Sequence, residues 1–222
     1  MPPTFSNLCG HFRRVAYPIF SGGLPPGSNR PPVLPSPWMP RPSDPVFLLL
    51  YPSKDAARQM VGLASCLGDR YSLRHQPTEQ DRLHSTQYFV DCFENMTPGR
   101  FAEIDHVVSR LTMPPFVACY DRAMKFGKTK GNLVLCGDEG VTGVRMLHDE
   151  LATAMRMIGF RHWERNFTPH ITLNYGECAV PEQPVEGISW IVDELFLVCS
   201  AYGRSKHLVL GRWRLQTPIR FH

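Results

Sequence analysis

Two His-x-Thr segments, His84-Ser85-Thr86 and His170-Ile171-Thr172, hold the residues of this 222-residue chain that are best suited to do chemistry. In an extended strand the side chains alternate between faces, so residues i and i+2 share a face about 7 Å apart. A threonine hydroxyl can hydrogen-bond a phosphate oxygen, while an imidazole can move a proton near neutral pH. Each segment therefore predicts one half of a site that handles phosphate.

Two such pairs facing each other would hold a phosphoryl group between two imidazoles. The neutral imidazole would take a proton from water, and the charged one would give a proton to the leaving oxygen. This scheme requires no metal and no other cofactor. A zinc site built from His84, His170 and a carboxylate is the alternative, and no ligand motif in the sequence favours it. We therefore predict one active site that cleaves a phosphate ester by histidine acid–base chemistry.

The surroundings of the two segments carry more weight than their spacing. With nine histidines and eleven threonines in the chain, chance alone supplies roughly half a His-x-Thr. Each segment, however, lies in an apolar run that follows a predicted helix, and Pro169 directly precedes the second one. A polar pair on an otherwise apolar strand needs partners or a function. The context therefore favours a functional interpretation.

Alternating strand and helix patterns predict the elements that would position these residues. We expect strands at residues 46–51, 83–93, 116–126, 132–136, 169–175, 189–198 and 206–214, and helices at 54–67, 98–111 and 140–158. Ser53 is the expected N-cap of the first helix, and Gly159 is expected to end the third. Because the strands cluster in runs, the order favours an α+β fold over a doubly wound parallel sheet.

The N-terminal part of the chain differs from the rest in composition. Twelve of the 21 prolines lie in residues 1–45, which excludes helix interiors and central strands there. We predict an extended or disordered arm over residues 1–45 and a folded domain over residues 46–222. The arm also carries the excess charge, because residues 1–43 hold four arginines and no acid, leaving 20 basic and 20 acidic residues elsewhere. A neutral domain favours contact with a short stretch or one end of RNA over a long nucleic acid.

Cysteine usage and hydropathy limit the class of protein. The seven cysteines are scattered and form no Cys-x-x-Cys pair, which disfavours a disulfide framework and a cysteine zinc site. No apolar run approaches the ~20 residues needed to span a bilayer. An acid-free leader with arginines is also found in organelle transit peptides, but its prolines oppose an amphipathic helix. We expect a cytoplasmic protein that makes no membrane contact and is a monomer.

Several segments resemble one known family. Residues 167–173, with the sequence Phe-Thr-Pro-His-Ile-Thr-Leu, are similar to the second motif of the two-histidine (2H) phosphoesterases. Within that superfamily the chain resembles the bacterial RNA 2',3'-cyclic phosphodiesterases, also called the 2'-5' RNA ligase family. Residues 190–198 and 211–215 resemble the C-terminal strands of that family, and residues 47–52 resemble its first strand. The resemblance spans about residues 45–215 and omits the Pro-rich arm.

The resemblance implies a fold, a reaction and a set of site residues. The fold would be bilobal α+β, with two pseudo-symmetric lobes of antiparallel sheet, helices outside and a central cleft. His84 would protonate the leaving ribose oxygen, His170 would activate water, and Thr86 and Thr172 would bind the phosphate. The implied reaction opens a 2',3'-cyclic phosphate to a 2'-phosphate, and the implied partners are RNA 3' ends or small nucleotides.

Two residues depart from the family pattern. Gln87 stands where an aliphatic residue is common, and because it lies on the opposite face from His84 we expect it to affect packing rather than chemistry. Tyr175 stands where Arg or Lys is usual, and it could stack on a base or donate its hydroxyl to the substrate. Phe126 lies near the place of a family aromatic, so that base stacking and core packing are both open for it.

Other residues near the motifs favour ordinary roles. We expect solvent or packing roles for His75, His106, His148, His162 and His207, with His148 on the solvated face of its helix. Lys125, Lys128 and Lys130 fit a solvated turn or a phosphate-tracking patch. Arg161 and Arg165 fit loop orientation or substrate contact.

Two alternative functions stay open from the sequence. The same histidines could cleave or join 2'-5' linkages, and a module that binds RNA ends without turnover would keep the fold. The retained pairs of histidine and threonine favour an enzyme.

Overall fold

The computed structural model describes residues 39–127, 131–161, 166–201 and 206–216. Within these residues the chain forms the following strands and α-helices: β1 Pro45–Leu50, α1 Lys54–Arg70, β2 Ser85–Cys92, α2 Pro98–Val108, β3 Phe116–Phe126, β4 Asn132–Cys136, α3 Thr142–Met157, β5 His170–Asn174, β6 Gln183–Val192, β7 Glu194–Ala201 and β8 Lys206–Arg214. A short 3-10 turn, Gln80–Arg82, precedes β2. None of the helices in this part of the chain has the length and apolar content to cross a membrane.

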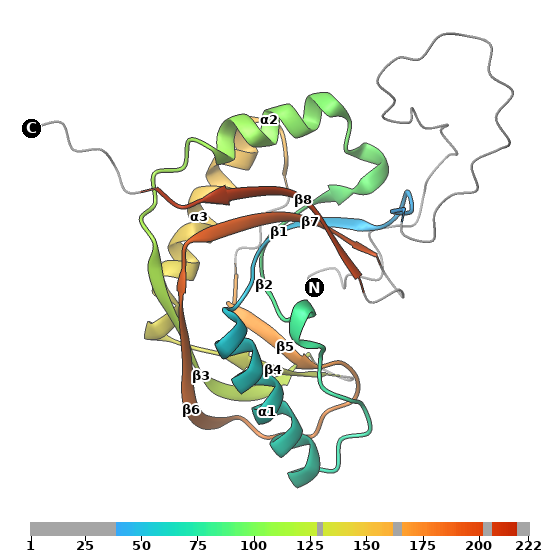
Figure 1. Ribbon diagram of the computed structural model, residues 1–222, viewed down its shortest axis with the longest axis vertical. Helices are drawn as coiled ribbons and strands as arrows, with labels where there is room; N and C mark the ends of the chain where they lie inside the picture. The colour runs from blue at the N-terminus through green and yellow to red at the C-terminus, as the bar shows by residue number, and fades with distance from the viewer. Residues whose placement is uncertain (1–38, 128–130, 162–165, 202–205, 217–222) are drawn as a thin grey trace, which may run out of the picture. The chain divides into compact units, whose positions relative to one another are not determined.

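The strands form two four-stranded antiparallel sheets, in the orders β2-β1-β7-β8 and β5-β4-β3-β6. We call the sheet β2-β1-β7-β8 the first lobe and the sheet β5-β4-β3-β6 the second lobe (Figure 1). The α+β prediction is confirmed. Each His-x-Thr segment belongs to an edge strand, β2 in the first lobe and β5 in the second.

The predicted single strand over residues 189–198 is wrong. The chain leaves β6 at Val192 and enters β7 at Glu194, and these two strands belong to different sheets (Figure 1). Between them, the Asp193 carbonyl accepts a hydrogen bond from the Leu215 amide at 2.8 Å. Buried positions in β6 are even-numbered, ending with Trp190 and Val192, whereas in β7 they resume at Leu195 and Leu197. One polar residue thus shifts the phase of alternation and transfers the chain between lobes.

The three helices lie where the sequence predicts them, with ends that differ by up to three residues, and the predicted N-cap and C-terminal glycine are confirmed. Ser53 Oγ accepts a hydrogen bond from the Ala56 amide at 3.2 Å at the start of α1, and Gly159 adopts a positive φ of 88° after α3. Helix α1 contacts β5 and β6, and α3 contacts β2 and β3. Their apolar stripes supply core residues such as Met60 on α1 and Leu147 on α3. The motif strands are therefore backed by packed helices.

His148 is buried, and the expectation that it is solvated is wrong. It is 4% exposed, because it follows the stripe residue Val144 by four positions and shares its face of α3. Its Nδ1 donates to the Gln87 carbonyl at 2.7 Å, and its ring stacks on Phe167 with 3.8 Å between centroids. His148 therefore connects β2, the strand of the first motif, to Phe167, which lies just before the second motif.

Gln87 also lies in the core, at 1% exposure. Its amide Nε2 donates to Ser85 Oγ at 3.3 Å, and the same oxygen accepts from the Tyr120 hydroxyl at 3.1 Å. The departure from an aliphatic residue is thus accommodated by a small buried polar network behind the first motif.

Candidate active site

Both motifs show the strand alternation expected of them. In β2, Ser85 and Gln87 point into the core, whereas Thr86 and His84, which directly precedes the strand, are half-buried. In β5, Ile171 and Leu173 are fully buried, whereas His170 and Thr172 are half-buried. In each lobe the histidine and threonine therefore lie on the accessible side of a strand whose other side is core.

The two motif strands meet. Strands β2 and β5 are in contact, and the segment that leads to the first motif runs beside β5. There the Thr78 amide donates to the Leu173 carbonyl at 2.7 Å, and Pro77 forms an isolated bridge with Asn174. The charge of His170 acts on the pKa of His84, so the two imidazoles lie within electrostatic range of each other. The structure thus brings His84 and His170 into one site.

The two imidazoles are anchored in the same way. His84 Nδ1 lies 2.6 Å from the Arg82 carbonyl oxygen, and His170 Nδ1 lies 2.8 Å from the Thr168 carbonyl oxygen. A carbonyl oxygen can only accept a hydrogen bond, so Nδ1 carries the hydrogen in both rings. This fixes the tautomer, in which Nε2 is the nitrogen of each ring that can exchange a proton.

An imidazole held in this way can serve as base or acid at Nε2. When the ring is neutral, Nε2 accepts a proton, and when the ring is charged, Nε2–H donates one. Burial lowers the pKa of His84 below its ordinary value, the hydrogen bond to the Arg82 carbonyl offsets part of this, and the charges of His170 and Arg82 lower it further. The free protein therefore favours neutral His84, and a phosphate anion bound beside it would favour the charged form.

The threonines leave their hydroxyls available. Within the described residues neither Thr86 nor Thr172 makes a side-chain hydrogen bond, and both are half-buried. Hydroxyls in this position can donate to non-bridging phosphate oxygens.

Of the two aromatic residues predicted to contact the substrate, Phe126 contacts a motif histidine and Tyr175 does not. Phe126 ends β3, is 38% exposed, and stacks on the His170 ring with 4.5 Å between centroids, so it lies at the site rather than in the core. Tyr175 follows β5 and is 45% exposed. Within the described part of the chain, no hydrogen bond or ring contact joins Tyr175 to either histidine.

The sequence interpretation missed two residues beside His84. The ring of His207, at the start of β8, packs edge-on against the His84 ring with 4.9 Å between centroids. The Tyr51 hydroxyl forms a 2.9 Å hydrogen bond with His207 Nδ1. Burial, with the charges of His84 and Arg82, lowers the pKa of His207 to about 4. His207 is therefore a third, neutral imidazole at the site.

The buried neutral state of His207 makes a prediction about acid stability. Its pKa is about 4 in the folded protein against 6.5 ordinarily, so protonation favours unfolding, and stability present above pH 6.5 is lost as the pH falls toward 4. Between these pH values, the melting temperature of the wild-type protein should fall more than that of His207→Phe, by roughly a few degrees. Thermal melts at matched ionic strength measure this, and parallel curves for the two proteins would contradict it.

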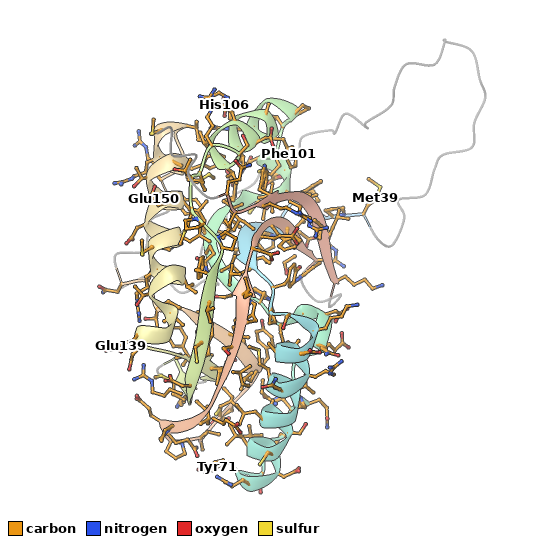
Figure 2. All side chains as sticks on the ribbon, turned by 60° about the vertical axis from the view of Figure 1, so that its left-hand side comes forward. Met39, Tyr71, Phe101, His106, Glu139 and Glu150 are labelled. Atoms are coloured by element: carbon orange, nitrogen blue, oxygen red, sulfur yellow. The ribbon has the colours of Figure 1, made fainter. Side chains whose placement is uncertain are left out.

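The remaining candidates are exposed, half-buried or outside the described residues. His75, His106 and Arg161 are exposed, and Figure 2 shows His106 on the outer side of α2. Lys125 is half-buried near the end of β3. The described residues bring together no three His, Cys, Asp or Glu side chains that fit a metal site. Lys128, Lys130, His162 and Arg165 lie outside the described residues.

Comparisons with known proteins agree with the fold. Among solved structures, a phosphoesterase is similar at 21% identity over 79% of this chain and 99% of that chain, with a TM-score of 0.68. LigT of E. coli complexed with 3'-AMP is similar at 22% identity over 78% of this chain and 98% of that chain, with a TM-score of 0.66. TT0787 of Thermus thermophilus is similar at 18% identity over 78% and 98%, with a TM-score of 0.65. No curated protein matches the chain.

These structures confirm the predicted two-lobed 2H phosphoesterase fold. A family model, the 2'-5' RNA ligase superfamily, matches residues 67–201, a range that contains both His-x-Thr segments. The predicted relation to the 2H phosphoesterases is thereby confirmed as well, and it points to an enzyme of phosphoesterase or ligase type. The chain belongs to the 2'-5' RNA ligase superfamily.

Proposed function

We propose that this protein is a phosphodiesterase that opens 2',3'-cyclic phosphates on RNA 3' ends or small nucleotides and leaves a 2'-phosphate. The observation that carries the proposal is the paired anchoring of His84 and His170. Both rings are held through Nδ1 on carbonyl oxygens, and both belong to edge strands that meet. Two imidazoles of fixed tautomer on either side of one phosphate are suited to transfer two protons in one reaction.

The proposed reaction assigns one proton transfer to each lobe. Neutral His170 takes a proton from water at Nε2 while the water oxygen forms a bond to phosphorus. The bond from phosphorus to the ribose 3' oxygen breaks, and charged His84 gives its Nε2 proton to that oxygen. The product is a 2'-phosphate with a free 3'-hydroxyl, and exchange with solvent restores the two protonation states.

The threonines and the phosphate complete the proposed site. Thr86 and Thr172 would donate hydrogen bonds to the two non-bridging oxygens, which orients phosphorus between the rings. The anion would also raise the pKa of His84 in the complex, because a nearby negative charge favours the charged imidazole. Substrate binding would thus protonate the acid that the reaction requires.

Product analysis tests this function. Purified protein with EDTA is incubated with an oligonucleotide that ends in a 2',3'-cyclic phosphate, and the 2'- and 3'-phosphate products are resolved. We expect the 2'-phosphate alone, because the proposed reaction assigns the acid to the 3' oxygen. A 3'-phosphate product would reverse that assignment, and the absence of hydrolysis would refute the proposed function.

A second candidate is the cleavage or joining of 2'-5' linkages, and membership of the 2'-5' RNA ligase superfamily favours it. This reaction uses the same two proton transfers, with a ribose hydroxyl in place of water. The same preparation incubated with a 2'-5'-linked dinucleotide distinguishes the two candidates by the faster of the two rates.

A further inference from the structure

Arg82 lies directly beside the proposed acid. It is the last residue of the turn Gln80–Arg82, and its backbone carbonyl accepts the hydrogen bond from His84 Nδ1 at 2.6 Å. The bond that orients the imidazole therefore also fixes the backbone of Arg82 next to it.

The guanidinium of Arg82 has no partner among the described residues. The residue is half-buried, and its Nε is buried without a hydrogen bond. The other half-buried arginines of the described chain bind carboxylate or carbonyl oxygens: Arg100 binds Glu103, Arg122 binds Asp138, and Arg145 binds the Asp138 carbonyl. A buried donor that lacks an acceptor is costly in free energy. The site therefore has a cation whose acceptor the described chain does not provide.

The charge of Arg82 acts at the site. It lowers the pKa of His84 and that of His207, whose rings are 4.9 Å apart. The other groups that act on these two rings are His170 on β5, which lowers the pKa of His84, and Tyr51, which bonds His207. Burial raises the pKa of Tyr51, and the charge of Asp81, the exposed neighbour of Arg82, adds to this. The guanidinium is thus within electrostatic range of the proton donor itself.

A cation in this place meets a need of the site. The phosphate of the substrate is an anion, and Tyr175, the residue that follows β5, carries no cationic group. A guanidinium is permanently charged, and its planar set of donors matches two phosphate oxygens at once. Arg82 has both the charge and the free donors that binding a phosphate requires.

We propose that the Arg82 guanidinium binds the phosphate group of the substrate beside His84. The inference rests on the proposed function for the identity of the substrate. The charge of Arg82 has opposite effects on the protonation of His84 in the free protein and in the complex with substrate. It opposes protonation of His84 in the free protein, and it draws in the anion that promotes protonation in the complex.

Binding of inorganic phosphate to the full chain tests the inference without turnover. Arg82→Met removes the charge and keeps the apolar stem, and Arg110→Met is the matched control, because Arg110 is exposed after α2. Calorimetry should show phosphate affinity about 10- to 100-fold weaker in Arg82→Met, the range of a charge-assisted hydrogen bond. Affinity should be intermediate in Arg82→Lys and unchanged in Arg110→Met.

A second readout separates an electrostatic role from a purely structural one. The pKa of His84, followed by NMR of its ring signals, should rise in Arg82→Met, because a positive charge that opposes protonation has been removed. The pKa of His84 should be unchanged in Arg82→Lys, because the positive charge is kept. If Arg82→Met does not fold, Arg82→Lys is the variant that tests the inference. Equal phosphate affinity in wild type and Arg82→Met, or lost affinity without a change in the pKa of His84, would overturn the inference. Phosphate binding that depends on Arg82, in a protein that leaves cyclic phosphates intact, would refute the proposed function and keep this inference.

Discussion

Alanine in place of His84 or His170 is expected to lower kcat on a 2',3'-cyclic phosphate by about 10²- to 10⁴-fold, the usual contribution of one acid or base. Each imidazole has its own proton to move, and each is held through Nδ1 by a different carbonyl. The two single variants should therefore be similarly impaired. The double variant should lose less than the product of the two single losses, because the protons move in a shared transition state.

The control for these variants is another histidine of the same chain. His106 is exposed on α2, and His106→Ala should leave kcat unchanged. Single-turnover rates with saturating protein measure the effect on chemistry, and thermal melts verify folding. Undiminished turnover in His84→Ala or in His170→Ala would refute the assigned role of that residue.

The second large effect is a separation between the pH dependences of kcat/KM and kcat. Both should be bell-shaped, because one imidazole must be neutral and the other charged. The rate falls at high pH as the acid loses its proton. In the free protein burial lowers the pKa of His84, so this fall in kcat/KM should begin below its ordinary value of 6.5. In the complex the phosphate anion raises that pKa, so the fall in kcat should lie at higher pH.

Initial rates across about pH 5 to 8 measure both curves, in the range where histidines titrate. Because two coupled histidines share their apparent pKa values, NMR titration of His84 with and without phosphate makes the assignment. The pKa of His84 should rise when phosphate is present. A flat profile with chemistry rate-limiting, or a pKa of His84 that phosphate leaves in place, would contradict the acid–base scheme.

Local features of the fold followed from the sequence. The Ser53 cap, the Gly159 end of α3 and the accessible faces of both motifs depend on neighbours a few residues away, which propensity and alternation describe well. The merging of β6 and β7 was wrong because apolar runs flank the pair Asp193-Glu194, and the change of sheet depends on distant partners, β3 for one strand and β1 for the other. Hydrophobicity patterns do not record which strand pairs with which.

Features of the site that depend on the order of strands were missed for the same reason. Tyr51 follows β1 and His207 begins β8, and they are 156 positions apart in sequence. They meet through the order β2-β1-β7-β8, which is not the order in the chain. His148 could have been placed correctly, because its spacing of four from Val144 puts it on the apolar stripe of α3. The wrong expectation came from the polar side chain of His148, whereas its position on the stripe indicated burial.

The matching carbonyl anchors of the two histidines bear on the direction of the reaction. The tautomer restricts neither imidazole to donating or to accepting a proton, because both keep hydrogen on Nδ1 and exchange protons at Nε2. By microscopic reversibility, a site that opens a cyclic phosphate with one imidazole as the proton donor can close it with the same imidazole as the proton acceptor. Ligation by a ribose hydroxyl and cleavage of the resulting 2'-5' linkage are then the two directions of one reaction, and hydrolysis is the same ring opening with water as the nucleophile. The concentrations of water and of RNA ends would determine which of these reactions is observed, and the arrangement of the side chains would not.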